Sequence, residues 1–216
     1  MQTRRNFIQK SGLIILGAAA NAGQAYSSLS PAKPTMIIDL NRCTGCQSCV
    51  IACKAHAKTA PEKFNTRLIT MEKDGSPARI IFTPIQCNQC DDPPCVPACP
   101  NNATYKLANG IVITDWDKCK SNGNCIDACP YDARFSDQNY YNRADKCDFC
   151  LDRLQQGLEP ACVEACSSGA RIFGDMNNPQ GEFAIYQQNK KLAARKPEEK
   201  TRPNVLYVQA AQGRGN

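Results

Sequence analysis

Residues 43–53 read Cys43-Thr44-Gly45-Cys46-Gln47-Ser48-Cys49-Val50-Ile51-Ala52-Cys53. In a run with this Cys-x2-Cys-x2-Cys-x3-Cys spacing, the first three thiolates surround one iron-sulfur cluster and the fourth serves a neighbouring cluster. The run therefore predicts a ferredoxin-like arrangement with more than one cluster, because the fourth thiolate needs a second cluster to bind.

The other members of the fifteen cysteines form three further groups, and every group ends in the same phrase. In that phrase Ala precedes the last Cys and a second Ala follows it by four positions, as in Ala52-Cys53 to Ala57. Two groups also have the Cys-Pro ending of ferredoxin runs. The sequence therefore predicts several iron-sulfur clusters. The three further groups are Cys87, Cys90, Cys95 and Cys99; Cys119, Cys125 and Cys129; and Cys147, Cys150, Cys162 and Cys166.

Two other uses of cysteine stay open at this point. A zinc ribbon pairs two separated Cys-x2-Cys units around one tetrahedral ion, which leaves no role for a third Cys in the same run. A disulfide scaffold suits exported proteins, but fifteen is an odd number, and the chain is long enough to form an ordinary hydrophobic core. Both alternatives fit the spacing less well than clusters do.

The N-terminus carries the features of an export signal. Thr3-Arg4-Arg5-Asn6-Phe7 is a twin-arginine signature, and a short apolar stretch followed by small residues comes after it. That stretch is shorter than the roughly 20 residues of a membrane span. We expect residues 1–25 to be a twin-arginine signal peptide and residues 26–35 a linker. The twin-arginine export machinery carries folded proteins, so clusters can be inserted in the reducing cytoplasm before export to the periplasm.

The net charge of +6 does not indicate nucleic-acid binding. A cluster with its thiolates carries about −2, so four clusters bring the loaded chain to roughly −2. Removal of the signal peptide also removes Arg4, Arg5 and Lys10. The mature, loaded protein is therefore expected to be acidic, and no nucleic-acid partner is predicted.

Short-range patterns predict an α+β fold. Arg67–Met71 and Arg79–Phe82 flank Asp74-Gly75 as the two strands of a hairpin, and Asn109-Gly110 marks a second hairpin turn. A short helix is expected between two ligands of the last motif, because three leucines there recur at helical spacing. These leucines are Leu151, Leu154 and Leu158.

An internal duplication divides the cysteine-rich region into two halves. Asp39 lies four residues before Cys43 and Asp115 lies four residues before Cys119, and a basic residue directly precedes each Cys. We expect two interleaved ferredoxin-like halves with four cluster-binding motifs within residues 36–175. Hairpin insertions and a C-terminal extension over residues 176–216 would complete the chain.

Two of the motifs resemble those of one family. Cys87-x2-Cys90-x4-Cys95-x3-Cys99 and Cys147-x2-Cys150-x11-Cys162-x3-Cys166 are similar to motifs of the four-cluster electron-transfer subunits of molybdopterin oxidoreductases of the dimethyl sulfoxide reductase family. The similarity covers nearly all of residues 36–173. Local phrases such as Cys129-Pro-Tyr-Asp-Ala-Arg134 most resemble tetrathionate reductase B subunits, with polysulfide, thiosulfate and nitrite reductase relatives close behind.

The resemblance implies a division of the ligands among four clusters. The first motif pairs with the fourth, and the second motif pairs with the third. The implied ligand sets are Cys43, Cys46, Cys49 and Cys166; Cys147, Cys150, Cys162 and Cys53; Cys87, Cys90, Cys95 and Cys129; and Cys119, Cys125 and Cys99.

The last of these sets lacks one thiolate. The spacing of its motif matches residues 43–53 without an insertion, so Asn122 stands at the second-ligand position. An amide oxygen is a harder and weaker ligand for iron than a thiolate. We therefore expect three [4Fe-4S] clusters and a fourth site with a [3Fe-4S] or an incomplete [4Fe-4S] cluster. The alternative is a degenerate site that holds no cluster.

The sequence shows no catalytic constellation: it has no nucleophile elbow, no phosphate loop and a single His. We expect a non-catalytic electron-transfer subunit. The resemblance implies that it stands between a quinol-oxidising membrane subunit, which also attaches it to the membrane, and a molybdopterin catalytic subunit. That partner would reduce tetrathionate or a related sulfur compound in anaerobic respiration. Alternatives are a subunit of a nitrite-reductase or sulfite-reduction complex, and a redox enzyme that uses the incomplete cluster as its substrate site.

Overall fold

The computed structural model describes residues 32–73 and 79–210. The expected signal peptide at residues 1–25 and the Asp74-Gly75 turn lie outside the described residues. The described chain is a mixture of short strands and short helices joined by long loops, in agreement with the predicted α+β class. Within it, no helix is both long and apolar enough to cross a bilayer.

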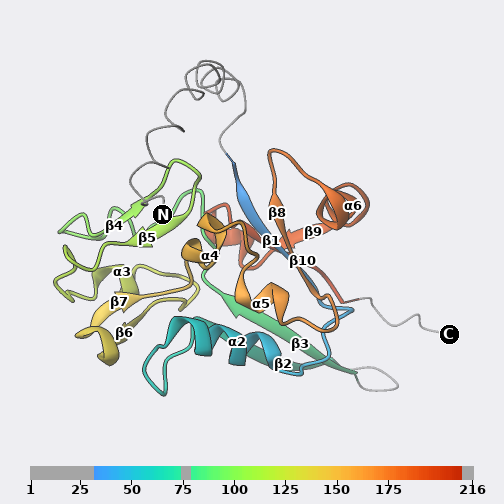
Figure 1. The fold of residues 1–216 in the computed structure, drawn as a ribbon, viewed down its shortest axis with the longest axis horizontal. Helices are drawn as coiled ribbons and strands as arrows, with labels where there is room; N and C mark the ends of the chain where they lie inside the picture. Colours follow the sequence, from blue (N-terminus) through green and yellow to red (C-terminus); the bar gives the residue numbers. More distant parts are fainter. Residues whose placement is uncertain (1–31, 74–78, 211–216) are drawn as a thin grey trace, which may run out of the picture. The chain divides into compact units, whose positions relative to one another are not determined.

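A four-stranded sheet brings together the two ends of the described chain. Its central strand β1 (Pro34–Asp39) runs antiparallel to β8 (Arg171–Asp175) and parallel to β10 (Val205–Val208), which also pairs with β9 (Leu192–Ala194). Figure 1 shows β1 in blue between β8 and β10 in orange and red. β1 begins inside the segment expected to be a linker, because pairing on both sides satisfies its backbone hydrogen bonds. The segment expected to be a C-terminal extension likewise supplies two strands of this sheet.

Strand β1 is buried on both faces, because successive side chains of a strand point to opposite sides. Met36 and Ile38 belong to the larger hydrophobic core, which also contains cysteines of several motifs. Ile37 points the other way and packs with Phe183 of helix α6 (Gly181–Asn189). The sheet therefore supports the cysteine loops on one face and is covered by α6 on the other.

Three hairpins carry the remaining strands. β2 (Thr66–Lys73) pairs with β3 (Arg79–Gln86), and β4 (Thr104–Lys106) pairs with β5 (Val112–Thr114). Both of these hairpins were predicted, and Gly110 at φ 85° provides the turn conformation expected of the second. The third, β6 (Phe135–Asp137) with β7 (Arg143–Asp145), was not predicted; the 3-10 helix η1 (Gln138–Tyr140) lies between its strands. The β4–β5 and β6–β7 hairpins lie on the left of Figure 1, and Trp116, two residues after β5, donates from Nε1 to Ala144 O in β7.

Four helices start inside the cysteine motifs: α2 (Ser48–Ala57), α3 (Asn124–Asp127), α4 (Leu151–Gln155) and α5 (Ala161–Glu164). A second 3-10 helix, η2 (Pro197–Glu199), lies near the C-terminus. The predicted helix at Leu151 is present as α4, but it ends at Gln155. Leu158 is therefore outside the helix and 46% exposed, so the spacing of the three leucines overstated the helix length. Gly157 has a φ of 73°, which a continuing helix could not accommodate.

The duplication seen in the sequence is also a duplication of local structure. Asp39 ends β1 and accepts a hydrogen bond from the backbone N–H of Asn41 at 2.9 Å. Asp115 follows β5 and accepts from the N–H of Asp117 at 3.0 Å. In both halves the carboxylate stabilises a turn by bonding the backbone two residues ahead. Each of these turns leads the chain from a strand into a cysteine loop.

Candidate iron-sulfur sites

All fifteen cysteines lie in the described part of the chain, and all are free thiols, so a disulfide scaffold finds no support. No three His, Cys, Asp or Glu side chains among the described residues are arranged to hold a single metal ion. The cysteines gather instead into four groups, here named sites I to IV. Site I has Cys43, Cys46, Cys49 and Cys166; site II has Cys147, Cys150, Cys162 and Cys53; site III has Cys87, Cys90, Cys95 and Cys129; and site IV has Cys99, Cys119 and Cys125.

Site I is a cavity of about 320 Å³ with four thiols in its wall. Three of them come from the segment between β1 and the first turn of α2, and Cys166 comes from the segment between α5 and β8. Gly45 shapes this loop: its φ is 74°, and a Cβ there would lie 2.6 Å from the ring of Phe82 in β3. Cys46 is exposed, so site I lies close to the protein surface.

In site II all four thiols are buried. Burial, followed by the charges of Cys53 and Cys162, raises the pKa of Cys147 well above its ordinary value. Burial and the charges of Cys162 and Cys53 likewise raise the pKa of Cys150 to about 12. The effect of one thiol's charge on the pKa of another thiol is strong only at short range. Cys53, which closes the first motif, therefore lies with the three thiols of the fourth motif.

Site III is a cavity of about 340 Å³. Cys87, Cys90 and Cys95 line it from the loop after β3, and Cys129 lines it from the segment after α3. Burial raises the pKa of Cys90 to about 12, and the charges of the other three thiols add to this effect. The second and third motifs thus share this site, just as the first and fourth share site I.

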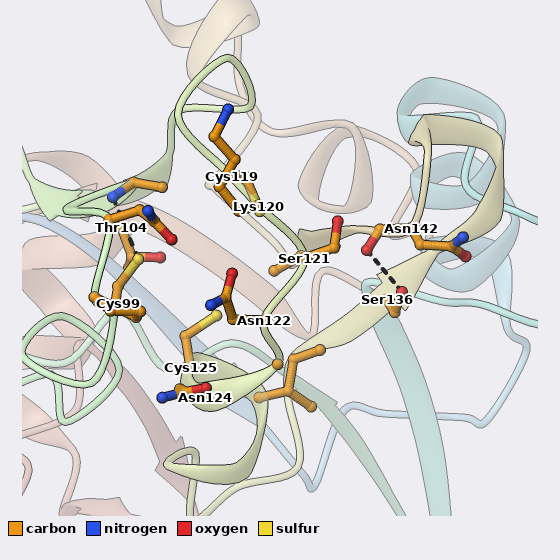
Figure 2. Close-up of a pocket in the computed structure, with 16 residues that line it drawn as sticks. Cys99, Thr104, Cys119, Lys120, Ser121, Asn122, Asn124, Cys125, Ser136 and Asn142 are labelled. Carbon is orange, nitrogen blue, oxygen red and sulfur yellow. Dashed lines mark hydrogen bonds between the residues drawn. The ribbon is translucent and has the colours of Figure 1, made fainter.

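Site IV, at about 460 Å³, is the largest of these cavities although only three thiols line it. Figure 2 shows Cys99, Cys119 and Cys125 around the cavity, with Asn122 among them on the loop that leads into α3. The three thiols and Asn122 therefore surround one partly open hollow.

The four cysteine loops share one backbone feature. The residue just before the second-ligand position has a positive φ in every motif: Gly45 (74°), Gln89 (48°), Ser121 (57°) and Phe149 (62°). A positive φ is uncommon for residues with a side chain and is retained where surrounding structure or function requires it. Ser121 directly precedes Asn122, so site IV has the backbone of a ligand loop although it lacks the thiol.

The donor sets fit iron-sulfur clusters. Iron binds cysteine as the thiolate, and burial disfavours that form, as the raised pKa of Cys150 shows. A cationic metal centre would stabilise the thiolates in these buried sites. In addition, Nε and Nη2 of Arg171 and Nε of Arg134 have no hydrogen-bond acceptor among the described residues, although all three atoms are buried. The sulfur atoms of a cluster accept hydrogen bonds from such groups.

Contacts and electrostatic interactions link site I to site II, site II to site III, and site III to site IV. Cys49 of site I contributes, after burial, to the raised pKa of Cys162 in site II. Gln89 Nε2 in the loop of site III donates to Cys147 O of site II at 2.7 Å. Cys95 of site III and Cys125 of site IV belong to one buried cluster.

Sequence reasoning missed the buried polar residues between these sites. Arg134, Lys146, Arg171 and Gln89 are all at most 4% exposed. A signal for the two arginines does exist, because each directly follows the last Ala of an Ala-Cys-x3-Ala phrase, at Ala133 and Ala170. The other two phrases are followed by Lys58 and Thr104. Nothing in the local pattern of Lys146 or Gln89 distinguishes them from surface residues.

Several known proteins have similar sequences. A family described as a 4Fe-4S dicluster domain matches residues 78–176, and one described as a 4Fe-4S binding domain matches residues 34–55. The B subunit of tetrathionate reductase from Salmonella typhimurium is 39% identical over 95% of this chain and 88% of its own length. The B subunit of polysulfide reductase from Wolinella succinogenes is 37% identical, over 84% and 96%. Protein NrfC homolog of Haemophilus influenzae is 33% identical, over 98% and 96%.

Proposed function

This protein belongs to the iron-sulfur B subunits of the dimethyl sulfoxide reductase family of molybdopterin oxidoreductases, and from that membership we propose its place in a respiratory complex. It transfers electrons through iron-sulfur clusters and leaves substrate chemistry to a partner. Its electrons come from a quinol-oxidising membrane subunit and pass to a molybdopterin catalytic subunit that reduces tetrathionate or a related sulfur compound. The observation that carries this proposal is the 39% identity with a tetrathionate reductase B subunit over 95% of the chain.

Four clusters in a row form the electron path of this proposal. Sites I, II and III each hold a [4Fe-4S] cluster through four thiolates, and site IV holds a [3Fe-4S] or an incomplete [4Fe-4S] cluster. The gathering of each proposed ligand set around one place in the structure supports this assignment. The contacts between consecutive sites support a path from I to IV in which each cluster exchanges electrons with its neighbours.

The substrate is tested on the complex that co-purifies with the full chain. We expect this complex to contain molybdenum and to oxidise quinol with tetrathionate as the electron acceptor. Polysulfide and nitrite serve as comparison acceptors. A complex that turned over with nitrite but not with tetrathionate or polysulfide would contradict the proposal. Tetrathionate reduction by the isolated chain would also contradict it, because the chain would then be an enzyme itself.

The proposed location is the periplasmic side of the membrane. It rests on the twin-arginine signature at Arg4 and Arg5, within the proposed signal peptide of residues 1–25. Residues 26–35 follow as a connecting segment, and residues 36–175 as two interleaved ferredoxin-like halves. Residues 176–216 complete the proposed organisation as a C-terminal extension that adds strands to the sheet.

Export is expected to depend on the arginine pair. Exchange of Arg4 and Arg5 together for lysine should leave the chain in the cytoplasm with its clusters inserted, because the export machinery reads the guanidinium pair and not the charge alone. Cell fractionation followed by iron analysis measures both properties. A lysine variant that reached the periplasm as efficiently as the wild type would contradict the proposed route.

A further inference from the structure

Three cationic side chains are buried in the described part of the chain. Arg171 and Arg134 are 3% exposed and Lys146 is 4% exposed. An isolated buried charge is very costly unless an opposite charge compensates it. Among the described residues none of the three forms an ion pair with a carboxylate within 4.0 Å. Their counter-charges must therefore be sought in the sites that they contact.

Arg171 lies between sites I and II. It lines the cavity of site I together with the four thiols of that site. Its Nη1 donates to Sγ of Cys162 in site II at 3.5 Å and to Oε1 of Gln86 at 2.8 Å. Burial would lower the pKa of Arg171, but the charges of Cys162 and Cys49, one from each site, raise it. Arg171 therefore interacts with both sites at once.

Arg134 occupies the corresponding place between sites III and IV. It lines the cavity of site III, and its Nη1 donates to Oγ1 of Thr104, which lines the cavity of site IV, at 3.2 Å. Its Nη2 donates to Oγ1 of Thr114 at 3.3 Å. Both acceptors are neutral hydroxyl groups, so neither neutralises the guanidinium charge.

Lys146 fills the remaining gap, between sites II and III. Its Nζ donates to the carbonyl oxygen of Cys147, a residue of site II, at 3.0 Å. It also donates to the carbonyl oxygen of Val112, which lines the cavity of site III. The carboxyl group of Asp145 is a neighbour that interacts with this charge, so Lys146 is partly compensated where the two arginines are not.

The two arginines also have equivalent positions in the sequence. Arg134 follows Cys129 by five residues and Arg171 follows Cys166 by five residues. Cys129 is the last cysteine of the third motif, but it belongs to site III, whose other thiols come from the second motif. Cys166 is the last cysteine of the fourth motif, but it belongs to site I, whose other thiols come from the first motif. The third and fourth motifs therefore place an arginine at the same distance after their last cysteine.

We propose that Arg171, Lys146 and Arg134 are the counter-charges of the electron path, one in each gap between successive sites. The proposal rests on the cluster assignment above. A cluster with its thiolates carries about −2 and gains a further negative charge with each electron it accepts from its neighbour. A fixed cation stabilises the reduced form and raises the reduction potential. A cation shared by two sites raises the reduction potentials of both clusters together. It therefore favours reduction of both clusters and leaves the difference in potential between them, which drives transfer across the gap, little changed.

The test compares neutral and charge-conserving variants of the two arginines in the iron-loaded full chain. The variants are Arg171→Gln, Arg171→Lys, Arg134→Gln and Arg134→Lys. Anaerobic redox titration followed by electron paramagnetic resonance gives the potential of each cluster. We expect Arg171→Gln to lower the potentials of sites I and II only, and Arg134→Gln those of sites III and IV only. The expected shift is about tenfold in the reduction equilibrium, or about 59 mV for one electron. The lysine variants should stay close to the wild type.

The spectroscopic difference of site IV identifies which pair has moved. If site IV holds a three-iron cluster, its potential should fall in Arg134→Gln and not in Arg171→Gln. Equal shifts of all clusters, or equal effects of lysine and glutamine, would overturn the inference. The glutamine variants can fail to load iron. In that case normal iron loading of the lysine variants supports the counter-charge role, whereas failure of the lysine variants to load iron as well overturns the proposal. Clusters absent from the wild type would instead refute the proposed function.

Discussion

The substitution Asn122→Cys is expected to add one iron per chain and to abolish the electron paramagnetic resonance signal of the oxidised protein. Oxidised [3Fe-4S] clusters are paramagnetic, whereas oxidised [4Fe-4S] clusters are not. The wild type should contain about 15 irons, from three four-iron clusters and one three-iron cluster, and the variant about 16. The loop of site IV already has the positive φ at Ser121 that precedes a second ligand in each other motif. A thiol at position 122 therefore needs no rearrangement of the backbone.

The variant Asn124→Cys is the matched control for this experiment. Asn124 lines the same cavity, but it stands one residue before Cys125 and not at a ligand position. It should leave the iron content and the spectrum unchanged. A response to Asn124→Cys, or no response to Asn122→Cys, would refute the ligand assignment of site IV. A wild type with about 12 irons and no oxidised signal would show that site IV holds no cluster.

The same substitution should lower the reduction potential of site IV. A fourth thiolate adds a negative charge and a new set of hydrogen-bonding contacts to the cluster, and these are the main factors that set its potential. Arg134 remains in place and compensates part of the added charge. Electron delivery through the complex should therefore slow down without stopping. This result distinguishes a site whose cluster has a lowered potential from a site that has lost its cluster.

The cysteine loops were predictable from the sequence because their ligands lie a few residues apart and the spacing itself reports the cofactor. The repeat of Asp39 at Asp115 was also visible in the sequence, and the turn that each carboxylate stabilises depends on a contact only two residues ahead. Hairpins with Asp-Gly or Asn-Gly between two strands also carry a local signal. These features need no knowledge of distant parts of the chain.

Long-range contacts explain what the sequence did not reveal. The parallel pairing of β10 with β1 joins Val205 to Met36, and no short motif announces such a pairing. The end of α4 at Gln155 depends on the backbone at Gly157 more than on the leucine spacing. Burial of Lys146 was equally hidden, because a charged residue in a sequence is most often at the surface.

The substitution Cys150→Ala is expected to interrupt electron transfer through the whole chain. In the proposed path site II stands between sites I and III, and all four of its thiols are buried. Without its cluster an electron must cross the full distance from site I to site III, and the rate of electron tunnelling falls exponentially with distance. Quinol-dependent reduction of tetrathionate by the assembled complex should fall at least about 100-fold, equivalent to about 2.7 kcal/mol in activation free energy.

Two further measurements separate an interrupted path from a failed assembly. Reduced dyes deliver electrons directly to a catalytic subunit, so dye-dependent turnover should persist in Cys150→Ala, with about four fewer irons per chain. The control is His56→Ala on α2, close to Cys53 of site II. His56 bonds Asp152 at 3.0 Å, but the Asp152 side chain is 62% exposed, and such surface pairs contribute little. Both activities should survive in the control. If quinol-dependent turnover survived in Cys150→Ala as well, electrons would bypass site II, and the single row of four sites could not be the path.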